Sequence, residues 1–191
     1  MRKKLFSEIP CLNGERVVLR QLTAADTDGL RELTENKKVY RYLPTFLYEN
    51  KYDDKSHVID HLYDECIKES LILGVFVDDA FCGLAEIYSY RAPLLKASVG
   101  YRLLERCWGK GIATETLGIL VKYLLEETDV KIITASTMVE NQASANVLRK
   151  NGFRHLTYTV LENWGYAKPV LTEKWIRTDE SFRLPYRFHS H

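Results

Sequence analysis

Hydrophobic residues occur along this chain in two patterns, compact apolar runs and longer stretches with helical spacing. Runs rich in β-branched and aliphatic residues predict β-strands, and they cover residues 15–22, 71–77, 81–90, 97–104, 130–137, 153–161 and 169–177. Apolar positions three or four residues apart predict helices, which are expected to begin at Thr23 and to cover 55–70, 109–127 and 141–151. Residues 37–54 are rich in tyrosine and lack a clear period, so a loop or broken helix is expected there.

The order of these elements predicts an α+β protein, that is, a mixed α/β fold built on one sheet. No repeat and no Pro/Gly/Ser-rich linker divides the chain. We therefore expect a single domain at 15–177, with an N-terminal extension at 1–14 and a C-terminal tail at 178–191. The length of 191 residues lies within the usual range for one domain.

Charge and apolar runs exclude several classes of protein. The chain has 27 basic and 26 acidic residues, whereas nucleic-acid-binding proteins usually have a basic excess. The longest apolar stretch, residues 71–77, is far shorter than the roughly 20 residues that span a bilayer. The basic start lacks the apolar core of a secretory signal, so a cytoplasmic protein is expected, with neither nucleic acid nor membrane as a partner. The cysteines and histidines lack zinc-ligand spacing, so no metal is expected.

A glycine-containing turn follows the strand predicted at 97–104. Gly109 and Gly111 lie directly before an amphipathic helical stretch. Glycine lets the backbone turn tightly and approach a ligand, and the N–H groups at the start of a helix attract a diphosphate. A Walker A loop is excluded because GxxxxGK followed by Ser or Thr is missing, and Thr114 stands where a Rossmann fingerprint needs its third glycine. A turn without a ligand is the alternative.

The sequence around this turn resembles the pyrophosphate loop of the GNAT superfamily of N-acetyltransferases. The resemblance begins with Arg106, Gly109 and Gly111 in the spacing Arg-x-x-Gly-x-Gly. The strand before the turn, the segment 141–146 and the ending Lys-Asn-Gly-Phe at 150–153 are also similar to motifs of that superfamily. The resemblance implies a single-domain GNAT-like fold, with a mostly antiparallel twisted central sheet, flanking helices and a splayed strand pair that holds the cofactor.

Within the superfamily, the chain is most similar to the RimJ/RimL branch of ribosomal-protein N-acetyltransferases. The similarity rests on Trp108, on Ile-Ala-Thr-Glu at 112–115, on Ser144 and on the opening strand Glu-Arg-Val-Val-Leu-Arg at 15–20. That branch includes many proteins that act on other amines, so the resemblance defines the cofactor better than the acceptor.

The resemblance implies acetyl-CoA as co-substrate and a primary amine as acceptor. Backbone N–H groups would hold the pyrophosphate, nearby cations would add charge, and a strand edge would pair with the amides of pantetheine. Asn141 and Asn146 would bind the pantetheine arm, although helix capping is an alternative for Asn141. The predicted cofactor-binding residues are Tyr101, Arg102, Leu103, Arg106, Trp108, Gly109, Lys110, Gly111, Ile112, Ala113, Asn141 and Asn146.

Two residues are predicted to be catalytic. Glu86 breaks the apolar pattern of its strand and is the first candidate for a general base, with a solvent-exposed strand face as the alternative. Glu140 and Glu162 are the reserve candidates. The resemblance implies that Ser144 donates a hydrogen bond to the departing sulfur, and helix packing is its alternative role.

The sequence departs from the superfamily at two positions. Leu148 stands where many members have a tyrosine acid, and Leu156 stands where the ribosomal-protein branch often has a glutamate. The leading prediction is acetyl transfer from acetyl-CoA to a primary amine by direct attack in a ternary complex. The acceptor is either a protein N-terminus or a small-molecule amine, and a catalytically inactive CoA-binding sensor is the alternative that the two leucines favour. A homodimer is a further expectation.

Overall fold

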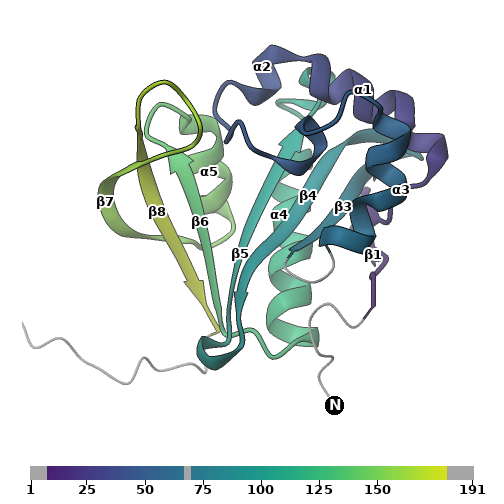
Figure 1. Cartoon of the computed structure of the whole chain (residues 1–191). Helices are drawn as coiled ribbons and strands as arrows, with labels where there is room; N and C mark the ends of the chain where they lie inside the picture. The colour runs from purple at the N-terminus through teal and green to yellow at the C-terminus, as the bar shows by residue number, and fades with distance from the viewer. Residues whose placement is uncertain (1–7, 67–69, 180–191) are drawn as a thin grey trace, which may run out of the picture.

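The strands of the described residues form one eight-stranded sheet, in the order β1-β2-β3-β4-β5-β6-β8-β7 (Figure 1). The computed structural model describes residues 8–66 and 70–179, so residues 1–7 of the predicted extension and 180–191 of the predicted tail lie outside the described residues. The strands are β1 (Leu12–Asn13), β2 (Val17–Arg20), β3 (Ser70–Val77), β4 (Ala80–Arg91), β5 (Lys96–Leu103), β6 (Ile132–Met138), β7 (Arg154–Glu162) and β8 (Val170–Thr178). Neighbouring strands are antiparallel, apart from the parallel pair β5 and β6.

Helices cover both faces of this sheet (Figure 1). They are α1 (Thr27–Glu35), α2 (Lys37–Tyr40), α3 (Lys55–Cys66), α4 (Ile112–Lys122), which a π-helical turn (Tyr123–Glu127) extends, and α5 (Gln142–Lys150). Helices α1 and α3 lie on one face and α4 lies on the other, so β3 is buried along nearly its whole length. The arrangement confirms the predicted mixed fold with its mostly antiparallel sheet. None of the helices within 8–66 and 70–179 is long and apolar enough to cross a membrane.

The structure corrects the predicted start of one helix and defines the segment at 37–54. The helix expected from residue 109 begins at Ile112, because Gly109 and Gly111 have φ values of 72° and 79°, which are left-handed and incompatible with an α-helix. The segment expected to be a loop or broken helix contains α2 and the 3₁₀ turn η2 (Tyr48–Asn50), which fits the broken-helix alternative. Both are shorter than the windows in which hydrophobic periodicity can be detected.

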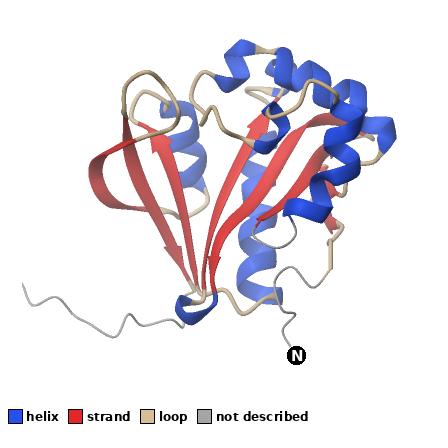
Figure 2. Ribbon diagram, in the orientation of Figure 1, coloured by secondary structure: helices blue, strands red, loops and turns tan. Residues whose placement is uncertain are grey.

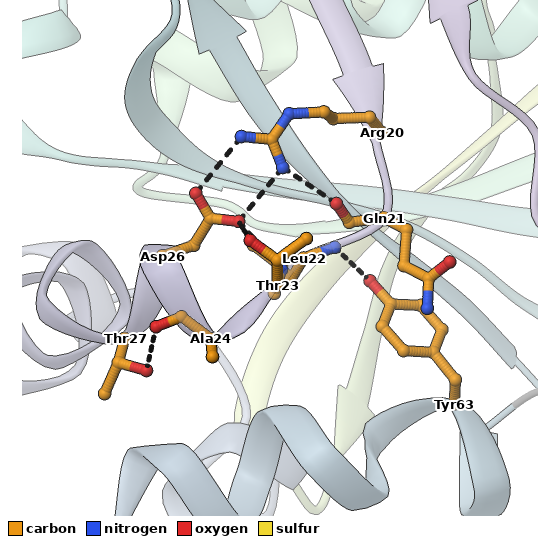
Figure 3. Close-up of polar contacts among 8 residues, drawn as sticks. All are labelled: Arg20, Gln21, Leu22, Thr23, Ala24, Asp26, Thr27 and Tyr63. Carbon is orange, nitrogen blue, oxygen red and sulfur yellow. Dashed lines mark hydrogen bonds and ion pairs between the residues drawn. The ribbon is translucent and has the colours of Figure 1, made fainter.

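A charged cluster fixes the chain where β2 leads into α1 (Figure 3). The Asp26 carboxylate accepts hydrogen bonds from the backbone N–H of Thr23 at 2.8 Å and from two nitrogens of Arg20 at 3.0 and 3.2 Å. The backbone N–H of Leu22 donates to the hydroxyl of Tyr63 at 2.7 Å, which ties the same turn to α3. Together these bonds hold α1 and α3 against one another on the same face of the sheet.

Strands β5 and β6 diverge within the sheet (Figures 1 and 2). They pair only where residues 96–98 lie against residues 132–134, and the hydroxyls of Ser98 and Thr134 are 2.8 Å apart there. Beyond Ser98, β5 keeps its partner β4 but has no paired strand on its other edge among the described residues. The divergence therefore leaves a row of β5 backbone groups available to a ligand, as the predicted splayed strand pair requires.

Candidate active site

A cavity of about 1070 Å³ occupies the space that the divergence of β5 and β6 opens. Its walls come from both strands, from the turn before α4, from α5 and from the segment that carries α2 and η2. Within the described parts of the chain, no group of three His, Cys, Asp or Glu side chains is placed to bind a metal ion.

The glycine-containing turn forms one end of the cavity. Gly111 is the N-cap of α4, and no side chain caps this helix end. The first hydrogen bond of the helix runs from Glu115 N–H to Gly111 O at 3.1 Å. The N–H groups of Ile112 and Ala113 therefore have no partner within the helix and lie at the positive end of its dipole. This geometry is suited to an anionic diphosphate.

Glu115 ties the turn to the start of the sheet. Its carboxylate accepts hydrogen bonds from the backbone N–H groups of Arg16, at 2.6 Å, and Val17, at 2.9 Å. The Arg16 guanidinium also donates to the carbonyl of Lys110 at 3.3 Å. Although partial burial opposes the charge, these backbone hydrogen bonds and the Arg16 charge lower the pKa of Glu115 below its ordinary value.

Most of the predicted cofactor-binding residues line this cavity. They are Tyr101, Arg102, Leu103, Trp108, Gly109, Gly111, Ile112, Ala113, Asn141 and Asn146. The backbone N–H of Trp108 was predicted to bind the pyrophosphate. In the structure it donates to Glu105 O at 3.1 Å instead. The indole of Trp108 donates to Leu103 O at 2.8 Å and so ties the turn to the end of β5.

The structure does not bring the two predicted cation side chains into the cavity wall. Arg106 instead pairs with Glu32 on α1 and donates to the carbonyl of Phe81 at 2.9 Å, because an opposite charge and an open acceptor both lie on that side. Lys110 has an exposed side chain outside the cavity lining. Neither side chain is therefore placed to add charge at the pyrophosphate position.

A buried ionic cluster lies beside the cavity. Arg102 on β5 donates to Glu49 at 2.8 Å and to Glu86 at 3.0 Å, and the hydroxyl of Tyr40 donates to Glu49 at 3.0 Å. The side chains of Arg102 and Glu49 are only 3% and 1% exposed, whereas Glu86 is 15% exposed and lines the cavity. Lys55 donates to the Glu49 carbonyl at 2.8 Å, which fixes η2 in place.

One guanidinium is shared by the two carboxylates of this cluster. Burial raises the pKa of Glu86 above its ordinary value, against the lowering effect of Arg102, and the charge of Glu49 adds to the rise. Burial and the nearby carboxylates of Glu86 and Glu162 also raise the pKa of Tyr88. Glu86 is thus a cavity carboxylate with increased basicity, as a general base requires.

A hydroxyl pair connects the two sides of the divergence. Tyr101 on β5 donates from its hydroxyl to the Ser144 Oγ on α5 at 3.2 Å. Asn141, the N-cap of α5, accepts from the Ser144 N–H at 3.2 Å, so the capping alternative for Asn141 is present in the structure. Asn146 lines the cavity and accepts from Arg149 at 2.8 Å.

The reserve carboxylates lie in different surroundings. Glu140 is exposed and outside the cavity lining. Glu162 lines the cavity, and the pKa of Glu162 is lowered because hydrogen bonds from Lys174 and Thr172 outweigh its partial burial. A lowered pKa makes Glu162 a weaker proton acceptor than Glu86. Tyr42, Phe46 and Tyr48, from the tyrosine-rich segment, also line the cavity.

Comparison with known proteins identifies the fold. A family model for the acetyltransferase (GNAT) domain matches residues 16–154. The chain belongs to the acetyltransferase (GNAT) family. It is 26% identical to the N-acetyltransferase YoaA of Bacillus subtilis over 149 residues, which cover 76% of this chain and 83% of YoaA.

Solved GNAT structures share the fold. An acetyltransferase (GNAT family) from Bacillus anthracis superposes with a TM-score of 0.76 at 19% identity, covering 88% of this chain and 98% of that chain. RimL, a ribosomal L7/L12 α-N-protein acetyltransferase solved in complex with coenzyme A, superposes with a TM-score of 0.72 at 19% identity, covering 90% and 98%. Mycobacterium smegmatis RimJ in complex with CoA-disulfide gives 0.75 at 20% identity, covering 93% and 89%.

The two departures from the GNAT pattern have different surroundings. Leu148 is buried and lines the cavity from α5, whereas Leu156 on β7 is 59% exposed and outside the lining. Sequence reasoning missed Glu49, and it assigned Arg102 a role through its backbone only. Glu49 stands between the apolar residues 46–48 and the polar residues 50–51, so the local sequence does not distinguish it from a surface carboxylate.

Proposed function

We propose that this chain transfers the acetyl group of acetyl-CoA to a primary amine by direct attack in a ternary complex, and that the acceptor is a protein N-terminus. The observation that carries the proposal is the continuity of one cavity. It joins the left-handed glycine turn, the unpaired edge of β5, the carboxylate of Glu86 and the hydroxyl of Ser144. When bound, acetyl-CoA supplies a thioester whose acyl carbon is open to attack by an amine.

The chain's backbone supplies most of the groups that would hold acetyl-CoA. The N–H groups of Ile112 and Ala113 would bind the pyrophosphate, because they are oriented along the helix dipole and have no intrahelical partner. An additional side-chain atom at Gly109 would meet no protein atom within 4 Å, so this residue leaves the turn open toward a ligand. The backbone of residues 101–103 would pair with the pantetheine amides as an added strand does.

Glu86 would act as the general base. Its Oε2 accepts from Arg102, and among the described residues no donor is recorded for its other oxygen, which can accept a proton from the attacking nitrogen. Ser144 would donate a hydrogen bond to the sulfur as the carbon–sulfur bond breaks. One proton thus leaves the amine at Glu86, and the negative charge that develops on sulfur is stabilised at Ser144.

The proposal of a protein N-terminus as acceptor rests on two points. An α-amine has a pKa near 7.7–8.0, so a base of raised pKa can deprotonate it near neutrality. The printed name of RimL, a structural neighbour, describes an α-N-protein acetyltransferase. A small-molecule amine is the second candidate, because the structural neighbour MccE is a self-immunity acetyltransferase solved with acetyl-CoA and AMP.

The decisive experiment measures acetyl-CoA consumption with a panel of peptides that carry free or blocked N-termini, together with lysine and small amines. Turnover that requires a free peptide N-terminus supports the proposal. Turnover with small amines alone assigns the second candidate, and CoA binding without any turnover would indicate a sensor.

A glycine variant tests the cofactor site separately. Asn tolerates left-handed φ, and Gly109→Asn adds a side chain where the protein itself leaves room. We expect calorimetry to show CoA affinity lowered by about tenfold or more, on the order of one lost charge-assisted hydrogen bond. Asp79→Asn, at a left-handed position outside the cavity lining, is the matched control and should bind CoA normally. Unchanged affinity in folded Gly109→Asn would contradict the assignment of the turn.

A further inference from the structure

The hydrogen bond between Tyr101 and Ser144 joins the two elements that the divergence of the sheet separates. Tyr101 lies on β5 and Ser144 lies in the first turn of α5, 43 positions later in the chain. Both residues line the cavity and both are partly buried. The bond thus reaches the hydroxyl that the proposed function assigns to the departing sulfur.

The direction of this bond determines where the serine hydrogen can point. The Tyr101 hydroxyl donates, so Ser144 Oγ uses one lone pair as acceptor and keeps its own hydrogen. A serine near a helix start commonly donates that hydrogen to a backbone carbonyl of the preceding turn. Among the described residues, no such acceptor is recorded for Ser144. Its hydrogen is therefore available to a group in the cavity.

One further hydrogen bond and the burial of Tyr101 restrict the pair. The backbone N–H of Ser144 is held by Asn141 Oδ1 at 3.2 Å, which fixes the position of the serine on the helix. Burial raises the pKa of Tyr101 above its ordinary value, although the hydrogen bond to Ser144 opposes the rise. Tyr101 consequently remains protonated near neutrality and keeps the hydrogen that it donates to Ser144.

We propose that Tyr101 is a positioning residue that orients the Ser144 hydroxyl so that its hydrogen points to the sulfur of CoA. The proposal rests on the proposed function, because it requires CoA in this cavity. Tyr101 acts through Ser144 and does not transfer its own proton. A donor that is itself the acceptor of a hydrogen bond is also a stronger donor, since neighbouring hydrogen bonds polarise one another.

This arrangement predicts a lowered pKa for the thiol of bound CoA. A hydroxyl that donates to the sulfur stabilises the thiolate, as hydrogen bonds to a charged form do. Loss of the Ser144 hydroxyl should therefore decrease the acid dissociation constant of the bound thiol by roughly ten- to hundredfold. Loss of the Tyr101 hydroxyl should decrease it by roughly tenfold, because an unoriented serine still donates part of the time.

The experiment titrates bound CoA without any acceptor. The thiolate absorbs in the ultraviolet, and the complex with desulfo-CoA supplies the background from protein tyrosines and cysteines. The titration is carried out on the wild type, Tyr101→Phe, Ser144→Ala and the double variant, each saturated with CoA as judged by calorimetry. Tyr90→Phe, which removes the 2.9 Å hydrogen bond to Asp129 outside the cavity lining, is the matched control.

The proposal predicts a specific coupling between the variants. Tyr101→Phe should raise the pKa of the bound thiol in the wild-type background and leave it unchanged in the Ser144→Ala background, while Tyr90→Phe changes neither. Equal shifts in both backgrounds, or no shift in either, would overturn the proposal. Failure of the wild type to bind CoA would instead reject the cofactor site, which calorimetry reports independently.

A second variant keeps the test decisive if Tyr101→Phe does not bind CoA. Fluorotyrosine at position 101 keeps the ring and the hydroxyl but makes the phenol a stronger donor. The bound thiol should then have a lower pKa than in the wild type, which is the opposite sign to the phenylalanine variant. A pKa that rises or does not change on fluorination would count against the orienting role.

Discussion

Removal of the buried cation at position 102 should destabilise the fold strongly and in a pH-dependent way. Arg102→Met keeps an unbranched side chain of similar length but deprives Glu49 and Glu86 of their common partner. Glu49 is only 1% exposed, so water cannot replace the lost guanidinium there, and Glu86 is 15% exposed. Two buried negative charges then remain close together.

The magnitude follows from this burial. Breaking a buried ion pair from one side costs about 3–5 kcal/mol, because the remaining charge is uncompensated. For a chain of this length each kcal/mol lowers the melting temperature by about 2–4 °C, so the expected decrease is roughly 6–20 °C. Arg106→Met is the control, since its ion pair with Glu32 is half exposed on both sides and should contribute about 0–1 kcal/mol.

The pH dependence has a definite sign. Without Arg102, burial and mutual repulsion should raise the folded-state pKa values of both carboxylates above the unfolded value of about 4.3. Groups whose folded pKa is raised contribute stability that is present below the unfolded pKa and is lost as the pH rises through the folded pKa. The deficit of Arg102→Met should therefore be small near pH ~4.5 and greatest near pH ~8.

Urea unfolding at both pH values measures these effects, provided that the slope with denaturant is the same for each variant. The triple variant Glu49→Gln, Arg102→Met and Glu86→Gln should recover most of the loss, because it removes both carboxylate charges together with the guanidinium that compensates them. A deficit below about 1 kcal/mol at neutral pH, or one that does not diminish in acid, would refute the reasoning.

Three further changes test the site and the turn. Ser144→Ala should lower kcat by roughly 10²-fold or less with little change in the KM for acetyl-CoA, and an unchanged kcat under conditions where chemistry limits turnover would return the serine to a packing role. Burial raises the pKa of Glu86, so wild-type activity should fall as the pH drops through that raised value. The activity of Glu86→Gln should instead keep increasing with pH up to the pKa of the acceptor. Identical pH–rate profiles for the two proteins would exclude this base. The lowered pKa of Glu115 contributes stability that is present above the unfolded pKa and is lost as the pH falls. Glu115→Gln should therefore decrease the free energy of unfolding by about 1–3 kcal/mol at pH ~7 and by little in acid, which urea unfolding at both pH values measures.

Local patterns predicted most of the fold and the cofactor side of the candidate site. The strands and long helices could be predicted because the spacing of their hydrophobic residues is visible within a short stretch of sequence. The glycine turn could be located because left-handed backbone favours glycine, and Gly109 and Gly111 have that conformation. The boundary error at the start of α4 arose from the same glycines, which allow a turn but do not by themselves show where the helix begins.

The elements, their order and the family resemblance could be read from the chain because each depends on residues close together in it. Which side chains meet at the cavity depends on the three-dimensional arrangement. Arg102 and Glu49 are 53 positions apart, Tyr101 and Ser144 are 43 positions apart, and the Arg106 side chain lies against α1 instead of the turn. Contacts at such separations follow no hydrophobic period. They depend on how the two halves of the sheet diverge and which elements then close around the space between them.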